Sequence, residues 1–131
     1  MLLLDTHILL WWINGTAGKL PSSLVATIED AESLAVSAIS CFEIEWLVSH
    51  GRIELEISLD EWFSGVFSEA GVNCLPITAE IARLAASLPE HHKDPQDRLI
   101  IATSIIHNLP DISADKQFSH YNEISDLLIT G

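Results

Sequence analysis

The sequence predicts an α/β fold, a three-layer α/β/α sandwich in which a central parallel sheet lies between two layers of helices. Short apolar runs bounded by turn residues alternate along the chain with longer helical patterns. Strands that alternate with helices form parallel sheets whose two faces are both covered. The chain has 131 residues and shows no repeat, low-complexity stretch or linker-like segment. We therefore expect a single domain over residues 1–131.

Local signals predict each element in the first half of the chain. The opening run MLLLD is too short for a helix and ends on an acid, which indicates a buried strand. A helix follows and ends at Asn14-Gly15, and Pro21 precedes a second helix over SSLVATIEDA. The run SLAVSA predicts the next strand. Two further helices are expected over residues 40–49 and 58–70, which end at His50-Gly51 and Gly71.

The second half continues this alternation. The run VNCLPI predicts a strand, and residues 78–87 predict a helix that ends before Pro89. Residues 95–107 carry the longest apolar helical pattern. PDISA then predicts a strand, and the tail EISDLLI is expected to supply a final one.

The composition is that of a folded protein outside the membrane. Apolar residues make up 48% of the chain and charged residues 19%, so disorder is not expected. No apolar run approaches the roughly 18 residues that a membrane span needs, and no signal peptide is recognisable. Cys41 and Cys74 lack CxxC spacing and are expected to be packed thiols in a reducing compartment. We therefore expect a cytoplasmic location.

The charge balance is strongly acidic, with 19 Asp and Glu against 6 Lys and Arg. A protein that holds nucleic acid by neutralising many phosphates shows the opposite balance. General, sequence-independent nucleic-acid binding is therefore disfavoured. An acidic surface suits a basic partner, metal ions or solubility alone.

Four acids stand where a parallel sheet gathers ligands, outside the carboxyl ends of its strands. Asp5 and Asp115 each follow a strand, whereas Glu43 and Asp97 lie in the opening turns of helices. Each acid also has a purely structural explanation. Ser40 and Glu43 have the spacing of a capping box, and Asp97 complements a helix dipole behind the N-cap Asp94. Taken singly, each acid is better explained as part of a cap.

The convergence of the four acids changes this balance. Helix N-termini and strand C-termini share one edge of a parallel sheet, and crowded carboxylates are costly unless a cation joins them. Mg²⁺ takes oxygen ligands and usually keeps several waters. The sequence shows no nucleophile motif and no glycine-rich phosphate loop. Metal-assisted hydrolysis of a phosphodiester is the chemistry that these residues support.

Four blocks of the sequence carry a family resemblance: LLLDTHILLWW, SAISCFEIEWLVSHGRIEL, LPEHHKDPQDRLIIATS and SADKQFSHY. In order and spacing they resemble small PIN-domain proteins, and most closely the VapC-type toxins of bacterial toxin–antitoxin pairs. The resemblance implies an α/β/α sandwich and a Mg²⁺- or Mn²⁺-dependent endoribonuclease. It implies hydrolysis of RNA by metal-activated water, which leaves a 5′-phosphate. The catalytic and metal-binding acids of the family fall here on Asp5, Glu43, Asp97 and Asp115.

Several residues around this quartet are candidates for its rim or for contacts that support it: Thr6, Asp94, Arg98, Ser113 and Lys116. The basic ones, with Lys93, could meet phosphates, and simple charge balance explains them equally well. Relatives often carry Phe at position 96, Thr at position 113 and Lys at position 47, where this chain has Gln96, Ser113 and Leu47. The lost lysine puts the affinity for RNA in doubt, and not the binding of metal.

The histidines and tryptophans have simpler interpretations. His91 and His92 lack the helical spacing of zinc ligands and are expected in a solvated loop. His7 is expected to pack against or orient nearby groups. The four tryptophans are expected in the core or in an interface rather than as platforms for stacking bases: Trp11, Trp12, Trp46 and Trp62.

The resemblance also implies a partner, because its members are held by small antitoxins with a DNA-binding end and a toxin-wrapping tail. The acidic charge suits a basic antitoxin that occupies the cleft, with Trp11 and Trp12 offered to it or to a homodimer contact. Two alternatives remain. One is a catalytically weak or inactive PIN-like protein-interaction module. The other is a phosphatase or phosphoacceptor domain, which would want a DxD pair that the segment DTH lacks.

Overall fold

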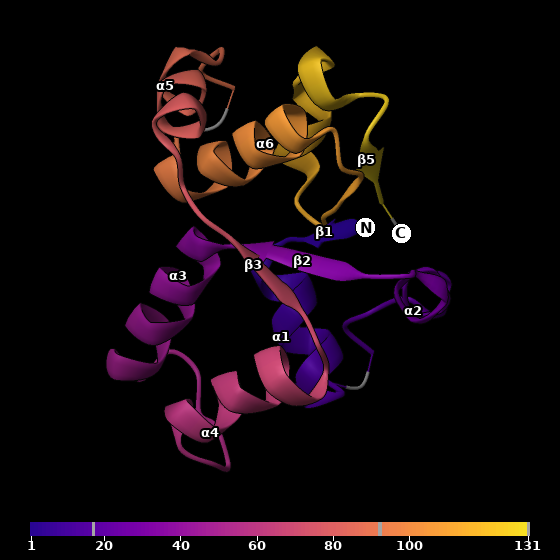
Figure 1. Ribbon diagram of the computed structural model, residues 1–131, viewed down its shortest axis with the longest axis vertical. Helices are drawn as coiled ribbons and strands as arrows, with labels where there is room; N and C mark the ends of the chain where they lie inside the picture. Colours follow the sequence, from indigo (N-terminus) through magenta and orange to yellow (C-terminus); the bar gives the residue numbers. More distant parts are fainter. Residues whose placement is uncertain (17, 92, 131) are drawn as a thin grey trace.

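The structure, a computed structural model, describes residues 1–131 except residues 17, 92 and 131. It confirms the predicted three-layer α/β/α sandwich (Figure 1). All strands pair in parallel, in the order β3-β2-β1-β4-β5. Their bounds are β1 (Leu2–Leu4), β2 (Leu34–Ser37), β3 (Asn73–Leu75), β4 (Asp111–Ile112) and β5 (Leu128–Ile129).

Helices cover the two faces of the sheet. Figure 1 shows α1, α3 and α4 on one side and α5 and α6 on the other, while α2 lies beyond one end of β2. The α-helices are α1 (Thr6–Asn14), α2 (Ser22–Asp30), α3 (Ala38–Ser49), α4 (Leu59–Ser64), α5 (Ala79–Ser87) and α6 (Pro95–His107). The π-helical turn η1 (Gly65–Glu69) continues α4, and the 3₁₀ turns η2 (Lys116–His120) and η3 (Asn122–Ile124) precede β5. Within the described residues, no helix combines the length and apolar character needed to cross a bilayer.

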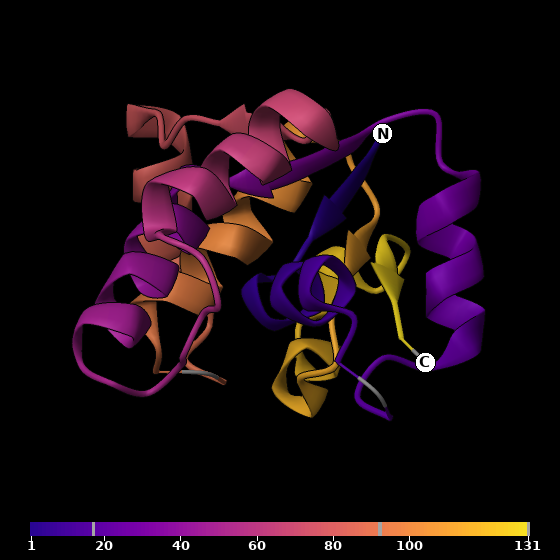
Figure 2. The ribbon, with the colours of Figure 1, turned by 90° about the horizontal axis from the view of Figure 1, so that it is seen from below.

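Alternating side chains of the strands feed two separate cores. Leu4 and Ile112 join a cluster with Ile8 of α1 on one face, whereas Leu3 packs with Ile100 of α6 on the other face. Successive side chains of a strand point to opposite faces, which explains the division. Figure 2 shows the twist that turns β5 away from the direction of β2. Because all strands are parallel, their carboxyl ends still open towards one edge.

The start of α3 differs from the prediction. Ser37 is the N-cap, and its side chain accepts a hydrogen bond from the Ile39 N–H at 3.2 Å. The helix therefore begins at Ala38, and the interpretation of Ser40 and Glu43 as a capping box is wrong. Ser40 is instead buried inside the helix, and its hydroxyl shares a 2.8 Å hydrogen bond with that of Thr6. The hydroxyl of Ser40 thus binds a residue far away in the sequence instead of capping the helix.

Most other boundaries agree with the sequence signals. Gly15 ends α1 in the left-handed conformation with φ 62°, where glycine is favoured. Asp94 caps α6 by accepting the Gln96 N–H at 2.8 Å. The helix expected over 58–70 divides into α4 and η1, and the strand expected over 72–77 shortens to β3. Cys74 is exposed and Cys41 is half-buried, so the expectation of two packed thiols is wrong for Cys74.

Candidate active site

A cleft of about 300 Å³ opens at the carboxyl edge of the sheet. Its lining residues follow the ends of β1 and β4 or lie in α1, in α3 and at the start of α6. They are Asp5, His7, Trp11, Glu43, Asp94, Asp97, Ala114 and Asp115. The structure thus brings all four acids of the predicted quartet to one cleft. Among the described residues that line it, none is Lys or Arg.

Asp5 stands at the junction of β1 and α1 and is held at both carboxylate oxygens. Oδ1 accepts the Thr6 N–H at 2.8 Å, and Oδ2 accepts the Ser113 hydroxyl at 2.8 Å. Burial raises the pKa of Asp5 to about 6. The hydrogen bonds from Ser113 and Thr6 and the charge of His7 act in the opposite direction, and the charge of Glu43 raises the pKa slightly further. Asp5 therefore favours a proton or a cation at its side.

Ser113 links Asp5 to Asp115. Its hydroxyl donates to Asp5 and accepts the Asp115 N–H at 3.0 Å. Asp115 in turn caps η2, because its Oδ1 accepts the Gln117 N–H at 2.9 Å. An acid can therefore cap a helical segment and line the cleft at the same time. In Asp5 and Asp115 the cap hydrogen bond also orients the carboxylate. Ser113 is fully buried and supports the two acids from behind.

Glu43 lies in the second turn of α3 and is half-buried. Its Oε1 is buried and has no hydrogen-bond partner among the described residues. A buried carboxylate oxygen without a partner costs free energy, and such groups are rare in folded proteins. The cap that would have explained Glu43 does not exist, because Ser37 takes that place.

Asp94 and Asp97 enter the cleft from the start of α6, and both are half-buried. Asp94 is the N-cap and Asp97 lies in the first turn. Both positions place a negative charge beside the positive end of the helix dipole, which partly offsets the repulsion among the acids.

Arg98 does not line the cleft, although it follows Asp97 in the sequence. Its guanidinium is buried and donates to backbone carbonyls around the end of α5: Nε to Ala85 at 3.0 Å, Nη1 to Pro89 at 3.1 Å, and Nη2 to Ala86 and Leu88 at 3.2 and 2.7 Å. This arrangement replaces the expected position at the rim. Lys93 and Lys116 are exposed and lie outside the lining.

Sequence reasoning missed two aromatic residues of the cleft. His7 is exposed and Trp11 is half-buried, and their ring centroids lie 5.9 Å apart at an interplanar angle of 55°. Both line the cleft together with the acids of the other elements. Their spacing of i and i+4, starting two residues after Asp5, was the available signal, because it places both on the α1 face next to that acid.

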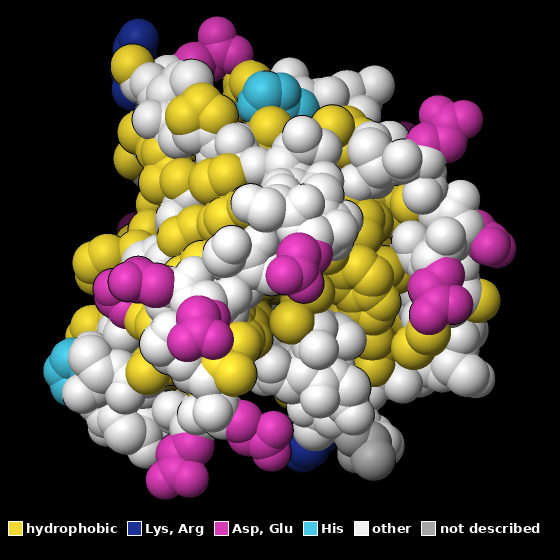
Figure 3. Space-filling view, turned by 60° about the horizontal axis from the view of Figure 1, so that its bottom comes forward, with side chains coloured by type: hydrophobic (Ala, Val, Ile, Leu, Met, Phe, Trp, Pro, Cys, Tyr) yellow, Lys and Arg dark blue, Asp and Glu magenta, His cyan; other side chains and the backbone are white. Residues whose placement is uncertain are grey.

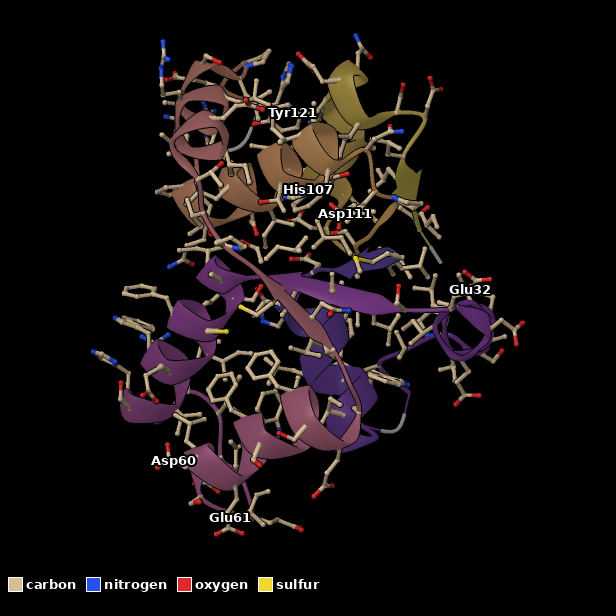
Figure 4. The ribbon with its side chains drawn as sticks, in the orientation of Figure 1. Glu32, Asp60, Glu61, His107, Asp111 and Tyr121 are labelled. Carbon is tan, nitrogen blue, oxygen red and sulfur yellow. The ribbon has the colours of Figure 1, made fainter. Side chains whose placement is uncertain are left out.

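A buried acid beneath the cleft was also missed. Asp111 begins β4 between Leu3 and Leu128 and is fully buried. Figure 4 shows it inside the fold, below α6. Burial raises its pKa well above the usual range, and the charges of Asp5 and Asp97 raise it further. Neither carboxyl oxygen has a hydrogen-bond partner among the described residues, so burial and the neighbouring charges both favour the protonated form of Asp111.

The remaining aromatic and histidine predictions divide. Trp62 is buried in the core, whereas Trp46 is exposed and stacks on His50 at 4.0 Å between ring centroids. His91 is exposed, as expected, with its ring 5.0 Å from that of Tyr121. His92 lies outside the described residues.

The donor set of the cleft suits a hard, oxygen-loving cation. Five carboxylates line it, and the unpartnered Glu43 Oε1 and the raised pKa of Asp5 both favour an incoming positive charge. Across the part of the chain that the structure describes, no three His, Cys, Asp or Glu side chains form a ready-made metal cage. Mg²⁺ does not need one, because it binds through one or two carboxylates and keeps several waters. The residues present therefore fit such an ion.

Comparisons with known proteins show the family and the fold of this chain. The PIN domain family model matches residues 2–124. The chain is 37% identical over 116 residues to a protein named Ribonuclease VapC22 from Mycobacterium tuberculosis, which covers 88% of this chain and 87% of that protein. The fold matches the toxin–antitoxin complex from Klebsiella pneumoniae with a TM-score of 0.69 at 21% identity, over 99% of this chain and 97% of that one.

A second solved structure shares the fold. The chain matches VapBC2 from Rickettsia felis, bound to a promoter DNA fragment, with a TM-score of 0.70 at 18% identity, over 98% of this chain and 97% of that one. At such low sequence identities, the likeness to these two structures shows the fold alone. The family model and the sequence relative cover most of the chain, and on that ground this protein belongs to the PIN domain family.

Proposed function

We propose that this protein is a Mg²⁺- or Mn²⁺-dependent endoribonuclease and acts as the toxin of a VapBC-type toxin–antitoxin pair. The related protein named Ribonuclease VapC22 supports the activity, and the solved toxin–antitoxin complexes of the same fold support the pairing. The proposed metal-binding and catalytic residues are Asp5, Glu43, Asp97 and Asp115.

The observation that carries the proposal is the state of Glu43. Its Oε1 is buried and unpartnered at the wall of a cleft lined by four more carboxylates. Among the described residues the predicted capping box does not explain the glutamate, since Ser37 caps the helix and Ser40 bonds to Thr6. A cation shared with the neighbouring acids would satisfy this oxygen and relieve the repulsion.

The residues of the cleft divide the remaining work. Mg²⁺ or Mn²⁺ held by the acids would supply positive charge beside a phosphodiester and activate water. Ser113 and the Thr6 N–H hold the Asp5 carboxylate in one orientation, and Ser113 also ties Asp115 to it. With no Lys or Arg among the described lining residues, phosphate charge is left to the cation. Activity should therefore depend steeply on the divalent ion.

The proposed antitoxin partner has a second surface available. A groove of about 460 Å³ runs between the end of α1 and the segment before α4, and is lined by Ile13, Asn14, Thr16, Glu54, Leu55, Glu56, Ile57 and Trp62. Ile57 is 49% exposed there, beside two glutamates. Figure 3 shows acidic side chains spread over the face with α4 turned forward, with apolar surface between them and basic side chains only at the margins. A basic, amphipathic chain fits this combination.

The test of the nuclease uses two glutamates on one helix. Glu43→Gln keeps the size of the side chain but removes the ligand charge, so RNA cleavage in Mn²⁺ should fall by roughly 100-fold or more. Glu45→Gln is the matched control, because Glu45 is exposed on α3 and does not line the cleft. Cleavage of single-stranded RNA is measured for both variants and for wild type in excess EDTA.

Equal activity in Glu43→Gln and wild type, or full activity in EDTA, would refute the proposal. A wild-type protein that binds its partner but cleaves no RNA with either metal would leave the alternative of an inactive protein-interaction module.

A further inference from the structure

The walls of the cleft are chemically unequal. Five of its lining side chains are acidic, and the two aromatic ones, His7 and Trp11, both come from α1. The rings lie 5.9 Å apart and are tilted by 55°, so they form a corner rather than a parallel stack. Trp11 packs on one side against the core while still lining the cleft, and His7 is exposed to solvent.

This inequality bears on how an RNA strand is held. The described lining has no Lys or Arg, and the whole chain has 6 such residues against 19 acids. Neutralisation of phosphate charge by the protein therefore contributes little to RNA affinity beyond what the bound cation supplies. Stacking of a base on an aromatic ring needs no protein charge and tolerates any sequence. The aromatic corner is the part of the cleft that offers it.

We propose that His7 and Trp11 form a stacking platform that holds one nucleobase of single-stranded RNA next to the bond to be cut. This inference rests on the proposed ribonuclease function and goes beyond it. The two residues are substrate-positioning residues, because they contact the base and leave the reacting phosphate to the acids. Trp11 is anchored by the core and fixes the corner, and His7 presents its ring to the strand.

The test separates binding from chemistry on a fluorescent single-stranded RNA that wild type cleaves at one mapped bond in Mn²⁺. Trp11→Leu keeps apolar packing against the core but removes the ring, and His7→Ala removes an exposed ring. Each should raise KM by roughly 5- to 100-fold, the range expected for one stacked base, with kcat unchanged. Trp11→Phe and His7→Phe keep a ring and should stay near the wild-type KM.

Two further RNA substrates make the matching change in the RNA. Each carries one abasic nucleotide, the first on one side of the cut and the second on the other side. One of the two abasic substrates should raise the wild-type KM by the same factor as Trp11→Leu. Combining that substrate with Trp11→Leu should cause no further loss, because the same contact is already missing.

Four outcomes would overturn the inference. The first is an active wild type together with Trp11→Leu and His7→Ala variants that both keep the wild-type KM; this result alone would be sufficient. A His7→Phe variant as weak as His7→Ala would show that the charge of His7 acts, and not its ring. Variants that only relieve inhibition by the antitoxin would assign the corner to protein docking. A wild type that cleaves no RNA removes the proposed function as well, which distinguishes the two failures.

Discussion

At the scale of single residues, the site depends on what each carboxylate of the cleft binds. Asp94 and Asp97 are three positions apart at the start of α6, and both line the cleft. Asp94 is committed to the N-cap through its bond with Gln96. Capping alone does not exclude an acid from the quartet, because Asp5 and Asp115 also cap helical segments. The quartet proposed for metal binding includes Asp97 because the resemblance to the family places its acid there, and Asp94 is left as a supporting neighbour.

This assignment predicts different effects of the same substitution at the two positions. Asp97→Asn keeps the shape of the side chain but removes a ligand charge, so RNA cleavage should fall by roughly 100-fold or more while the thermal unfolding temperature changes little. Asp94→Asn should retain most activity, because Asn caps a helix nearly as well as Asp. A larger loss in Asp94→Asn than in Asp97→Asn would show that the acids are assigned the wrong way round.

Asp5 predicts how stability depends on pH in the absence of divalent cations. Its pKa is about 6 in the folded protein against an ordinary 3.8, so below pH 3.8 the group is protonated in both states and costs nothing. As the pH rises towards 6 the unfolded chain gains by releasing the proton, and stability is lost. The loss amounts to at most about 3 kcal/mol, since one pKa unit corresponds to about 1.4 kcal/mol.

Urea unfolding in EDTA at pH 4.5 and 7.5 measures this loss. Wild type should lose more stability between the two values than Asp5→Asn, and excess Mg²⁺ should restore part of it at pH 7.5. Asp111 titrates in the same direction, and the charge of Asp5 contributes to its raised pKa, so the difference between the two proteins measures Asp5 together with its effect on Asp111. Parallel pH curves for the two proteins would contradict the raised pKa.

At the scale of elements, Arg98 decides how α5 and α6 meet. The residue belongs to α6, and its guanidinium binds the carbonyls of Ala85, Ala86, Leu88 and Pro89 around the end of α5. Carbonyls at the end of a helix lack partners within it. Arg98 donates hydrogen bonds to these carbonyls and so holds the start of α6, with its two acids, against α5.

Arg98→Lys and Arg98→Met should both lower the free energy of unfolding by roughly 3 kcal/mol or more, because an ammonium group cannot reproduce the planar fork of donors. Chemical denaturation measures the change, with Lys116→Met as a control at an exposed position. If Arg98→Lys were as stable as wild type but bound RNA more weakly, Arg98 would act at the rim of the cleft instead.

At the scale of the whole molecule, the net charge of −13 governs encounters with other molecules. The acids extend well beyond the cleft, since Glu32, Asp60 and Glu61 are exposed and point outwards from the region of α2 and α4 (Figure 4). A field of one sign accelerates association with a chain of opposite charge and repels RNA. The proposed basic partner and the proposed RNA substrate should therefore respond to salt in opposite ways.

Association with a small basic antitoxin, co-expressed from the neighbouring reading frame, should slow by roughly tenfold or more between 50 and 500 mM NaCl, with a smaller change in the dissociation rate. Ile57→Glu, in the groove beside Glu54 and Glu56, should weaken the complex without altering RNA cleavage. Surface-based kinetics and cleavage assays measure the two effects. A complex that fails to form, or that leaves cleavage unaltered, would remove the antitoxin proposal and leave the nuclease proposal standing.

The sequence by itself determined the succession of strands and helices along the chain, because short apolar runs and helical patterns are local properties. Packing in the folded protein reinforces them. It also placed the acids at one edge, since parallel strands end where helices begin. The caps at Asp94 and Gly15 were equally local.

Only the tertiary structure decided what distant partners do to individual side chains. Ser40 is not a cap because its partner is Thr6, 34 positions earlier in the chain. Arg98 turned towards α5 because unpaired carbonyls lie there, and local spacing carries no trace of them. Asp111 became a buried acid with a raised pKa because strands from elsewhere in the chain close around it. Hydrogen bonding and burial between segments far apart are set by packing, which a pattern of residues along one segment does not encode.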